Sequence, residues 1–413
     1  RVSLRLGRRP WSMIASSGGT GPKIGQEWQT IRVVFDVSAS SEEARVHMNL
    51  GGTLPKGAVF EFQPLTMERV TCTVADPLAV DVGNIIFDHG KVCGWKKWSI
   101  DELENPYDYF YDGVTWRVYL KSEKNPASLH SSIELALKRH VVNQGSCHHV
   151  VYDGLAVKYG AAHGFGGGNT ANLVIRNCDI AYIGGGHQLT RGTRHVRYGN
   201  GIEFWGACRD NLVENCRIWE IYDAALTNQG RGSSSKQINI TYQNNVIWNS
   251  EYSFEYWNNP ETALTENVRF VNNTCVNAGV VWSHAQRPDQ NGSHLMFYSN
   301  TAKSSGIVVK YNVFHTATEW GSRYSRGWKP LPDMDHNVWY SAKGVQCYFF
   351  RDKIADFAEY QKKTGLDAHS LYADPRFVDV ANGDYRLAPD SPARTLRPNN
   401  EPVGAAQLWN AQQ

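Results

Sequence analysis

Residues 177–180 read Asn-Cys-Asp-Ile, and residues 215–218 repeat this pattern as Asn-Cys-Arg-Ile. Four further segments keep the same shape, namely Asn-Asn-Val-Ile at 244–247, Asn-Asn-Thr-Cys at 272–275, Tyr-Asn-Val-Phe at 311–314 and His-Asn-Val-Trp at 336–339. Successive cassettes are 38, 29, 28, 39 and 25 residues apart. Self-similarity at this period is typical of solenoid proteins, in which each repeat packs on its neighbours. The sequence therefore predicts a stack of coils.

The residue types in the cassettes indicate how the coils are joined. An apolar, strand-like run leads into most of them, as in residues 173–175 (Leu-Val-Ile). Asparagine tolerates a left-handed turn, and its side chain can bond neighbouring groups. We expect asparagines stacked from coil to coil to form an internal hydrogen-bonded ladder.

Composition excludes several classes of protein. Of the 413 residues, 42 are Lys or Arg and 40 are Asp or Glu, so global charge does not favour a nucleic-acid partner. No apolar run approaches the ~18 residues that would span a membrane. The 37 Gly, 14 Trp and 20 Tyr suit a turn-rich all-β protein. The chain opens on a strand-like segment without a secretory leader, from which we expect that the natural N-terminus is missing. We separately expect the protein to be secreted or at the cell surface and to be a monomer.

The eight cysteines include no CxxC pair, which argues against a zinc site. Cys178 and Cys216 share one cassette position, so we expect stacked small core residues, with a disulfide as the less favoured alternative.

Two regions differ in pattern. Residues 1–75 contain alternating strand-like runs at 1–6, 30–37, 44–50 and 59–62. Residues 28–30 (Trp-Gln-Thr), 50–52 (Leu-Gly-Gly) and 56–60 (Lys-Gly-Ala-Val-Phe) make this region resemble the second half of a carbohydrate-binding jelly roll, a partial β-sandwich. Residues 76–413 carry the cassettes. Helices are expected there at 131–139 and 354–363, and a closing cap is expected from residue 374 onward.

The cassettes and the Asp-Pro-Arg-Phe-Val-Asp segment at 374–379 resemble the right-handed parallel β-helix, or pectin-lyase-like, proteins with which bacteria act on polysaccharides. The resemblance covers residues 76–395. It implies an all-β fold, a right-handed parallel β-helix preceded by the partial β-sandwich, and a polysaccharide or oligosaccharide as partner. It leaves the reaction open, because this fold hosts lyases, glycosidases, epimerases and phage spikes.

The strands that follow the cassettes predict a catalytic face. Aligning residues 201–205, 225–229, 253–257 and 281–286 sends Glu203 and Glu255 outward by period-two alternation, together with Trp205 and Trp257. With ~4.8 Å between rungs, the two glutamates would stand roughly 9–10 Å apart, close to the ~6.5–9.5 Å of an inverting glycosidase. Asp223 at the entry of the middle rung would lie about one rung from either. We predict that Glu203, Asp223 and Glu255 are the catalytic carboxyl groups.

Two loops flank this face. The insertion at 184–200 carries Arg191, Arg194 and Arg197, which could grip a carboxylate or sulfate on a sugar. The loop at 283–289 carries His284, Arg287 and Asp289. The residues predicted to bind substrate are Trp205, Trp257, His284, Arg287, Arg197 and Asn228.

Our preferred hypothesis is a glycoside hydrolase acting on a plant or microbial polysaccharide. A first alternative is a uronic-acid lyase, with His284 or Tyr198 as base and Arg191, Arg194 or Arg287 neutralising the carboxylate. A second is a non-catalytic glycan-binding protein. Polygalacturonase motifs are absent apart from the Ala-His-Gly fragment at 162–164. No cofactor is required by any of these; Asp333 and Asp335 could ligate calcium, although two carboxylates are too few to define a site.

Overall fold

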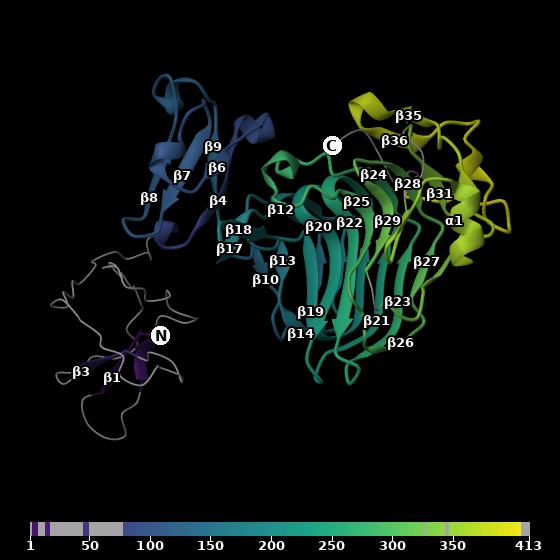
Figure 1. The fold of residues 1–413 in the computed structure, drawn as a ribbon, viewed down its shortest axis with the longest axis horizontal. Coiled ribbons are helices and arrows are strands. Elements are labelled where there is room, and N and C mark those ends of the chain that lie inside the picture. The colour runs from purple at the N-terminus through teal and green to yellow at the C-terminus, as the bar shows by residue number, and fades with distance from the viewer. Residues whose placement is uncertain are drawn as a thin grey trace. The chain divides into compact units, whose positions relative to one another are not determined.

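The computed structural model describes residues 77–325, 328–342 and 347–405, together with the backbone of 2–6, 13–16 and 44–48. The chain divides into two compact units, Arg1–Val80 with Asp112–Arg117, and Asp81–Tyr111 with Val118–Gln413 (Figure 1). In the first unit, β1 pairs antiparallel with both β2 and β3. These strands are Val2–Leu6, Met13–Ser16 and Ala44–Met48.

Two strands expected in residues 1–75 are thus present, those at 1–6 and 44–50. The strands expected at 30–37 and 59–62 lie outside the described residues. So does nearly all of the segment interpreted as a carbohydrate-binding β-sandwich, and that interpretation remains a prediction.

Two small sheets precede the cassettes. β4 lies between β5 and β9 and pairs antiparallel with both, while β6, β7 and β8 form a second sheet. The helix expected at 131–139 is wrong, because Ile133–Leu137 is strand β9, held against β4 from Ile133↔Phe87 to Leu137↔Val82. Pairing with β4 has overridden the helical propensity of this Leu- and Ala-rich segment. The bounds are β4 Val82–Phe87, β5 Val92–Cys93, β6 Trp95–Lys97, β7 Asp108–Asp112 and β8 Arg117–Leu120.

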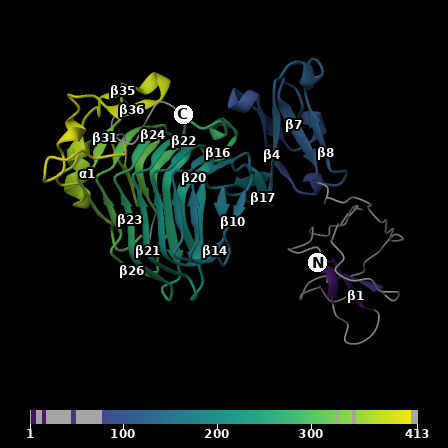
Figure 2. The same cartoon turned by 180° about the vertical axis from the view of Figure 1, so that it is seen from behind.

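From β10 onward almost all strands are parallel and join one large sheet (Figures 1 and 2). Its pairings follow three series, each stepping by one repeat. The first aligns Ile202, Leu226, Phe254 and Leu295; the second aligns Leu212, Thr241, Arg269 and Val308; the third aligns Arg217, Val246, Thr274, Val313 and Val338. The third series joins the third positions of successive cassettes, so the cassettes set the register.

The strands up to the middle of this sheet are β10 Val142–Asn143, β11 Val151–Asp153, β12 Ala156–Lys158, β13 Phe165–Gly166, β14 Gly168–Ala171, β15 Val174–Arg176, β16 Asp179–Ile183, β19 Ile202–Glu214, β20 Arg217–Arg231, β21 Lys236–Gln243 and β22 Val246–Asn259. Those that follow are β23 Leu264–Val271, β24 Thr274–Ala278, β25 Ser293–Phe297, β26 Lys303–Ser305, β27 Val308–Lys310, β28 Val313–Ala317, β29 Trp320–Tyr324, β30 Asp333–Asp335, β31 Val338–Tyr340, β32 Cys347–Phe349, β33 Asp352–Ile354 and β34 Leu371–Tyr372. A separate hairpin, β17 Gly186–Arg191 and β18 Arg194–Tyr198, occupies the long insertion.

The expected asparagine ladder is present. Asn245 Nδ2 donates to Asn273 Oδ1 at 3.0 Å, Asn273 Nδ2 to Asn312 Oδ1 at 3.2 Å, and Asn312 Nδ2 to Asn337 Oδ1 at 3.1 Å. Asn337 Nδ2 continues the chain to Asp367 Oδ1 at 2.9 Å. All five side chains are fully buried. The first cassette positions have positive φ throughout, from 54° at Asn177 to 62° at Tyr311, which is the left-handed turn that asparagine tolerates.

Buried apolar residues form one continuous cluster that includes Ile202, Phe204 and Phe254. Cys178 and Cys216 belong to it as buried free thiols, so the expectation of stacked core cysteines is confirmed.

The chain ends in a small cap. α1 (Phe357–Thr364) confirms the helix expected at 354–363, with Asp356 Oδ1 accepting the Glu359 N–H at 2.7 Å and Gly365 ending it at φ 72°. β35 (Phe377–Asp379) and β36 (Asp384–Leu387) follow as an antiparallel pair. Within the described ranges, none of the helices has the length and apolar character needed to cross a membrane.

Candidate active site

Glu203, Thr227 and Glu255 occupy one position on three consecutive rungs. Thr227 pairs with Glu203 on β19 and with Glu255 on β22. The neighbours Ile202 and Phe204 are buried in the core, so alternation turns the two glutamates away from it, as predicted. The alignment of residues 281–286 is wrong. The next rung is β25, because the extra residues of the 39-residue step form a loop before that strand, with a short 3-10 helix at His284–Gln286.

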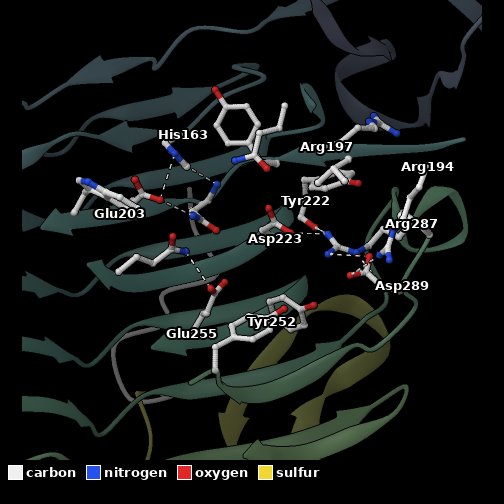
Figure 3. Close-up of a pocket in the computed structure, with 18 residues that line it drawn as sticks. His163, Arg194, Arg197, Glu203, Tyr222, Asp223, Tyr252, Glu255, Arg287 and Asp289 are labelled. Carbon is white, nitrogen blue, oxygen red and sulfur yellow. Dashed lines mark hydrogen bonds and ion pairs between the residues drawn. The ribbon is translucent and has the colours of Figure 1, made fainter. Parts of the chain in front are cut away.

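The three predicted carboxyl groups line one cavity of about 300 Å³ (Figure 3). Trp205, Arg197 and Arg287 line it too, so six of the predicted site residues meet there. Glu203 lies on β19 and Glu255 on β22. Asp223 lies on β20, four positions before Thr227. The expected separation of about one rung between Asp223 and either glutamate is therefore wrong for the backbone positions. That expectation did not include the displacement of Asp223 along the strand, which adds ~3.3 Å for each residue.

Glu203 is nearly buried and keeps one carboxylate oxygen occupied. Asn200 Nδ2 donates to Glu203 Oε2 at 2.9 Å, and His163 Nε2 lies 3.3 Å from the same oxygen. His163 Nδ1 accepts the Asn200 backbone N–H at 2.9 Å, and burial lowers the pKa of His163 to about 3, so the imidazole is neutral with its proton on Nε2. Burial raises the pKa of Glu203 to about 7, against the opposing effect of the Asn200 hydrogen bond.

Glu255 accepts its hydrogen bonds at Oε1. Gln229 Nε2 and Trp257 Nε1 both donate to Glu255 Oε1 at 3.1 Å. Burial, reinforced by the negative charges of Asp223 and Glu203, raises the pKa of Glu255 well above its ordinary value. Glu255 therefore retains its proton to higher pH than an ordinary glutamate does.

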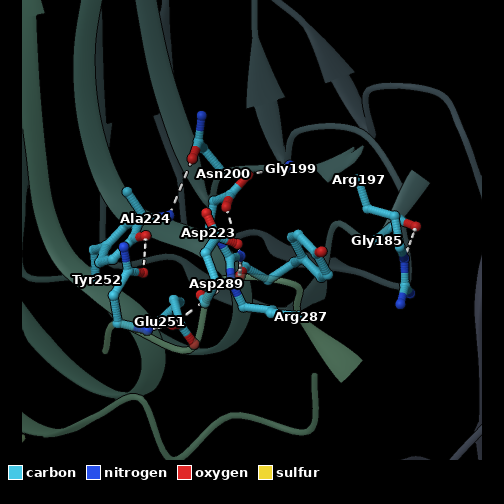
Figure 4. A network of polar contacts seen from close by, with 12 residues as sticks. Gly185, Arg197, Gly199, Asn200, Asp223, Ala224, Glu251, Tyr252, Arg287 and Asp289 are labelled. Atoms are coloured by element: carbon cyan, nitrogen blue, oxygen red, sulfur yellow. Dashed lines mark hydrogen bonds and ion pairs between the residues drawn. The ribbon is translucent and has the colours of Figure 1, made fainter. Parts of the chain in front are cut away.

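Asp223 belongs to an ion-pair network (Figure 4). Its Oδ1 accepts from Arg287 Nη1 at 2.7 Å, and its Oδ2 accepts the Gly199 N–H at 3.0 Å. Burial raises the pKa of Asp223, and the Arg287 guanidinium opposes that rise. Arg287 also contacts the buried Glu251, with Nε 3.6 Å from Oε1, and His284 Nδ1 lies 3.0 Å from Glu251 Oε2. Arg287 holds Asp223 in this network, and Figure 3 shows Asp223 between the two glutamates and Arg287.

Arg197 is buried and bound within the protein, whereas Arg194 lines the cavity with a side chain that is 52% exposed. Arg197 donates from Nε to Gly185 O, from Nη1 to Gln286 Oε1 and from Nη2 to Gly83 O, at 2.7, 3.0 and 2.7 Å. Arg194 lies in an ion pair with Asp289 at 3.4 Å. These pairings stabilise the loops that wall the cavity, which is a different role from the predicted grip on an anionic sugar.

Three of the residues predicted to bind substrate do not line the cavity. Asn228 is wrong, because it is fully buried in the coil, where its Oδ1 accepts from Tyr242 Oη at 2.8 Å. Its place in the strand matches Phe204 and Tyr256, both inward positions. His284 lines a neighbouring cavity with Glu220 and Trp282. Trp257 acts on the site indirectly, through its hydrogen bond to Glu255.

A possible metal-binding group lies far along the chain from this cavity. The side chains of Asp335, His336 and His369 bring ligand atoms within 4.8 Å of one another. Two imidazoles favour a transition metal over the calcium considered from the sequence. Asp333 is not part of this group, since its carboxylate pairs with Lys310 Nζ at 2.7 Å.

Sequence reasoning missed the residues that hold the glutamates, namely His163, Asn200 and Gln229. Gln229 could have been found, because it occupies the strand position of Trp205 and Trp257 on the middle rung. His163 and Asn200 lie outside the cassettes, in segments that contact Glu203 only once the turns have folded. The cassettes do not predict the conformation of those turns.

Comparison with known proteins adds one relative. No family model matches the chain, and no solved structure matches it. Over 231 residues the chain is 25% identical to the uncharacterized protein YwoF of Bacillus subtilis (strain 168), a match that covers 52% of this chain and 40% of that protein. The match thus spans less than half the length of that relative.

Proposed function

We propose that this protein is a secreted glycoside hydrolase built on a right-handed parallel β-helix, and that Glu255 and Glu203 act as its acid and base. The fold proposal is supported by the three parallel pairing series and by the interior asparagine ladder, since each repeat passes once through each series. The chemical proposal depends on one observation above all: Glu203 and Glu255 occupy the same position two rungs apart and line the same cavity.

The roles follow from the two environments. Burial and the charges of Asp223 and Glu203 raise the pKa of Glu255 well above its ordinary value, so we assign to Glu255 the proton given to the glycosidic oxygen. We assign the role of base to Glu203: Asn200 and His163 donate to its Oε2, and its other oxygen is available to accept a proton from water. Asp223, fixed by Arg287, is placed to bind a sugar hydroxyl.

The reaction is a single displacement. Glu255 protonates the glycosidic oxygen as the bond to the anomeric carbon breaks, while water bonds to that carbon and gives a proton to Glu203. Glu255 ends ionised and Glu203 protonated, and exchange with solvent restores both. Two rungs place the carboxyl-bearing positions roughly 9–10 Å apart, near the separation of ~6.5–9.5 Å that leaves room for this water.

The lyase alternative is less well supported. A lyase acting on a uronic acid needs a cation that neutralises the substrate carboxylate. Arg197 has each of its nitrogens committed to a protein oxygen, and Arg287 and Arg194 are engaged in ion pairs. Tyr198 lines the cavity and could act as base. The lyase reaction also needs an arginine to neutralise the substrate carboxylate, and these arginines are engaged within the protein.

Paired substitutions test the proposal. Glu203→Gln and Glu255→Gln should each lower kcat by roughly 10²–10⁴-fold on a polysaccharide that the native protein cleaves. Glu220→Gln is the matched control, because burial also raises the pKa of Glu220 to about 7 but its side chain lines the neighbouring cavity. Release of reducing ends without an ultraviolet-absorbing unsaturated product identifies hydrolysis. Near-native activity in both cavity variants, or an unsaturated product, would reject the proposal.

A further inference from the structure

The terminal coil carries a shortened form of the cassette. Residues 369–372 read His-Ser-Leu-Tyr, and Leu371 on β34 pairs with Val338, the third position of the sixth cassette. In this alignment Ser370 takes the place of the ladder asparagine, and its Oγ accepts the Asn337 backbone N–H at 2.8 Å. Residues 369–372 are therefore a seventh cassette, in which serine replaces asparagine.

Two histidines occupy the first positions of the sixth and seventh cassettes. The first four cassettes have asparagine there, whereas the sixth has His336 and the seventh has His369. The two rings stack with their centroids 5.3 Å apart and an interplanar angle of 26°. The step from one coil to the next thus places two imidazoles side by side, and imidazole is the side chain that proteins use most often to bind metals.

Asp335, the last residue of β30, supplies a carboxylate beside both rings. Its Oδ1 accepts the backbone N–H groups of His336 and His369, at 2.9 and 2.7 Å. Its Oδ2 lies 3.3 Å from His336 Nδ1 and 2.7 Å from His369 Nδ1. One oxygen is therefore held by the backbone while the other faces two ring nitrogens, as in a metal ligand oriented by outer hydrogen bonds.

The separations of these atoms suit a small divalent ion. One ligand atom from each of the three side chains lies within 4.8 Å of the other two. A tetrahedral ion with bonds of ~2.0–2.1 Å holds its ligand atoms ~3.3 Å apart. The contact between Asp335 Oδ2 and His336 Nδ1 already has this length. The His369 side chain is 70% exposed, so its ring can move outward by the small amount that the third ligand requires.

One of the ring nitrogens is left without a hydrogen bond. Nδ1 of His336 is buried and bonds to none of the residues that the structure describes, although Asp335 Oδ2 lies 3.3 Å away. A buried polar atom without a partner costs free energy. A metal ion bound by His336 Nδ1 and Asp335 Oδ2 would satisfy both atoms at once.

We propose that Asp335, His336 and His369 bind one divalent transition-metal ion, for which zinc is the best fit, and that this ion fastens the terminal coil to the sixth cassette. Two imidazoles and one carboxylate suit zinc better than calcium or magnesium. Water fills the fourth position on the exposed side of His369. Asp335 and His369 are 34 residues apart and enclose α1, so the ion closes this segment as a clasp. The inference is independent of the proposed hydrolase activity.

Metal binding is measured on the untagged chain after treatment with a chelator and dialysis. We expect titration calorimetry with Zn²⁺ to show one equivalent bound with a dissociation constant in the micromolar range or below. Co²⁺ should give the visible absorption of a four-coordinate ion. Asp335→Asn keeps Oδ1 as acceptor for the two backbone N–H groups and replaces Oδ2 with an amide nitrogen, so the affinity for Zn²⁺ should fall at least tenfold in a folded protein.

Two further variants complete this experiment. His369→Ala removes an exposed ligand and should also weaken Zn²⁺ binding at least tenfold. His148→Ala removes an exposed histidine that lies before β11, and as the matched control it should leave the affinity unchanged. Circular dichroism checks that each variant is folded. Absence of bound Zn²⁺ and Co²⁺ at submillimolar metal, or equal affinity in the native, Asp335→Asn and His369→Ala chains, would overturn the site.

Hydrogen exchange tests the clasp. With saturating Zn²⁺ the backbone amides of residues 357–372 should exchange at least tenfold more slowly than in the chelator-treated protein, because an ion bound only by the folded segment opposes its local opening. Zn²⁺ should have no such effect in Asp335→Asn, and the amides of β20 are the internal control in each sample. A bound ion that leaves exchange of residues 357–372 unaltered would overturn the fastening role while retaining the site.

Discussion

Two columns of polar side chains run along the same stack of strands, and they differ in how completely their polar atoms are hydrogen-bonded. In the interior column, Asn245, Asn273 and Asn312 each donate to the next member of the series and accept from the preceding cassette, so their amide groups are satisfied within the protein. In the column at the cavity, Glu203 and Glu255 accept hydrogen bonds at one oxygen only, from different partners. Both columns repeat at the spacing of the rungs.

The difference shows how a regular stack can carry a reactive site. A buried polar group that is fully paired stabilises the fold, because unfolding exchanges its bonds for bonds to water at little gain. A buried carboxyl group with one unpaired oxygen costs free energy, and the raised pKa of Glu203 measures part of that cost. The two columns should therefore respond to substitution with opposite signs.

The largest expected effect is on the interior column. Asn273→Ala removes the oxygen that accepts from the Asn245 backbone N–H and side-chain amide, and it removes the donor to the Tyr242 carbonyl. We expect the free energy of unfolding to fall by roughly 3–5 kcal/mol, as each buried group left unpaired costs ~1–3 kcal/mol. Chemical denaturation measures this. Asn267→Gly, on the exposed outer side with φ 54°, is the control and should change stability by less than ~1 kcal/mol. Equal losses in the two variants would contradict the assigned role of the ladder.

Substitution of Glu203 at the cavity should raise the free energy of unfolding at alkaline pH, whereas substitution in the ladder lowers it. Because the pKa of Glu203 is raised in the folded protein to about 7, the protonated form is favoured there, and its contribution to stability is lost as pH rises from the unfolded value through 7. Glu203→Gln removes this loss. At pH 8 the variant should be more stable than the native protein by roughly 3 kcal/mol, and the gain should disappear at pH 4. A variant that is less stable at pH 8 would refute the comparison.

Catalysis should report the same two carboxyl groups through its pH profile. The base Glu203 must be ionised, so kcat/KM should fall about tenfold for each pH unit below a limb near pH 7. The acid Glu255 must be protonated, and its raised pKa moves the alkaline limb of the profile to higher pH than an ordinary glutamate would give. An activity maximum near pH 4 would contradict these assignments.

The smallest effect concerns one hydrogen bond. Trp257 Nε1 donates to Glu255 and lowers the pKa of that carboxyl. Trp257→Phe keeps an aromatic ring and removes the donor, so the pKa of Glu255 should rise and the alkaline limb should move upward by less than about one pH unit. Trp205 also lines the cavity, and Trp205→Phe keeps the Trp257–Glu255 bond, so this variant should leave the limb in place. A downward shift in Trp257→Phe would be inconsistent with the bond.

Much of this arrangement could be predicted from repeated local patterns. The cassettes define the register because their third positions pair from coil to coil, and that register carries Glu203 and Glu255 onto one face. Prediction failed where the repeat is interrupted. The loop before β25 displaced the fourth rung, and β9 became a strand because β4 lies beside it.

The partners of the carboxyl groups depend on such interruptions. His163 reaches Glu203 because a turn 40 residues earlier in the chain folds toward it, and Arg287 reaches Asp223 from a loop 64 residues later. No periodicity encodes contacts of this kind. The loss of Asn228 from the site has a simpler cause: it lies at an inward position of its strand, which alternation alone could have revealed.

The asparagine ladder also has a direction. Each amide donates to the coil that follows, so the series needs a last member that only accepts, and Asp367 supplies it. Inside the series, one coil begins and ends with the same donor and the same acceptor as any other. A repeat could therefore be duplicated or deleted between Asn312 and Asn337, beyond the residues that line the cavity, without leaving a new unpaired amide in the ladder. The ladder makes the length of this protein adjustable in whole coils, while the cavity, which depends on loops of unequal length, stays tied to one place along it.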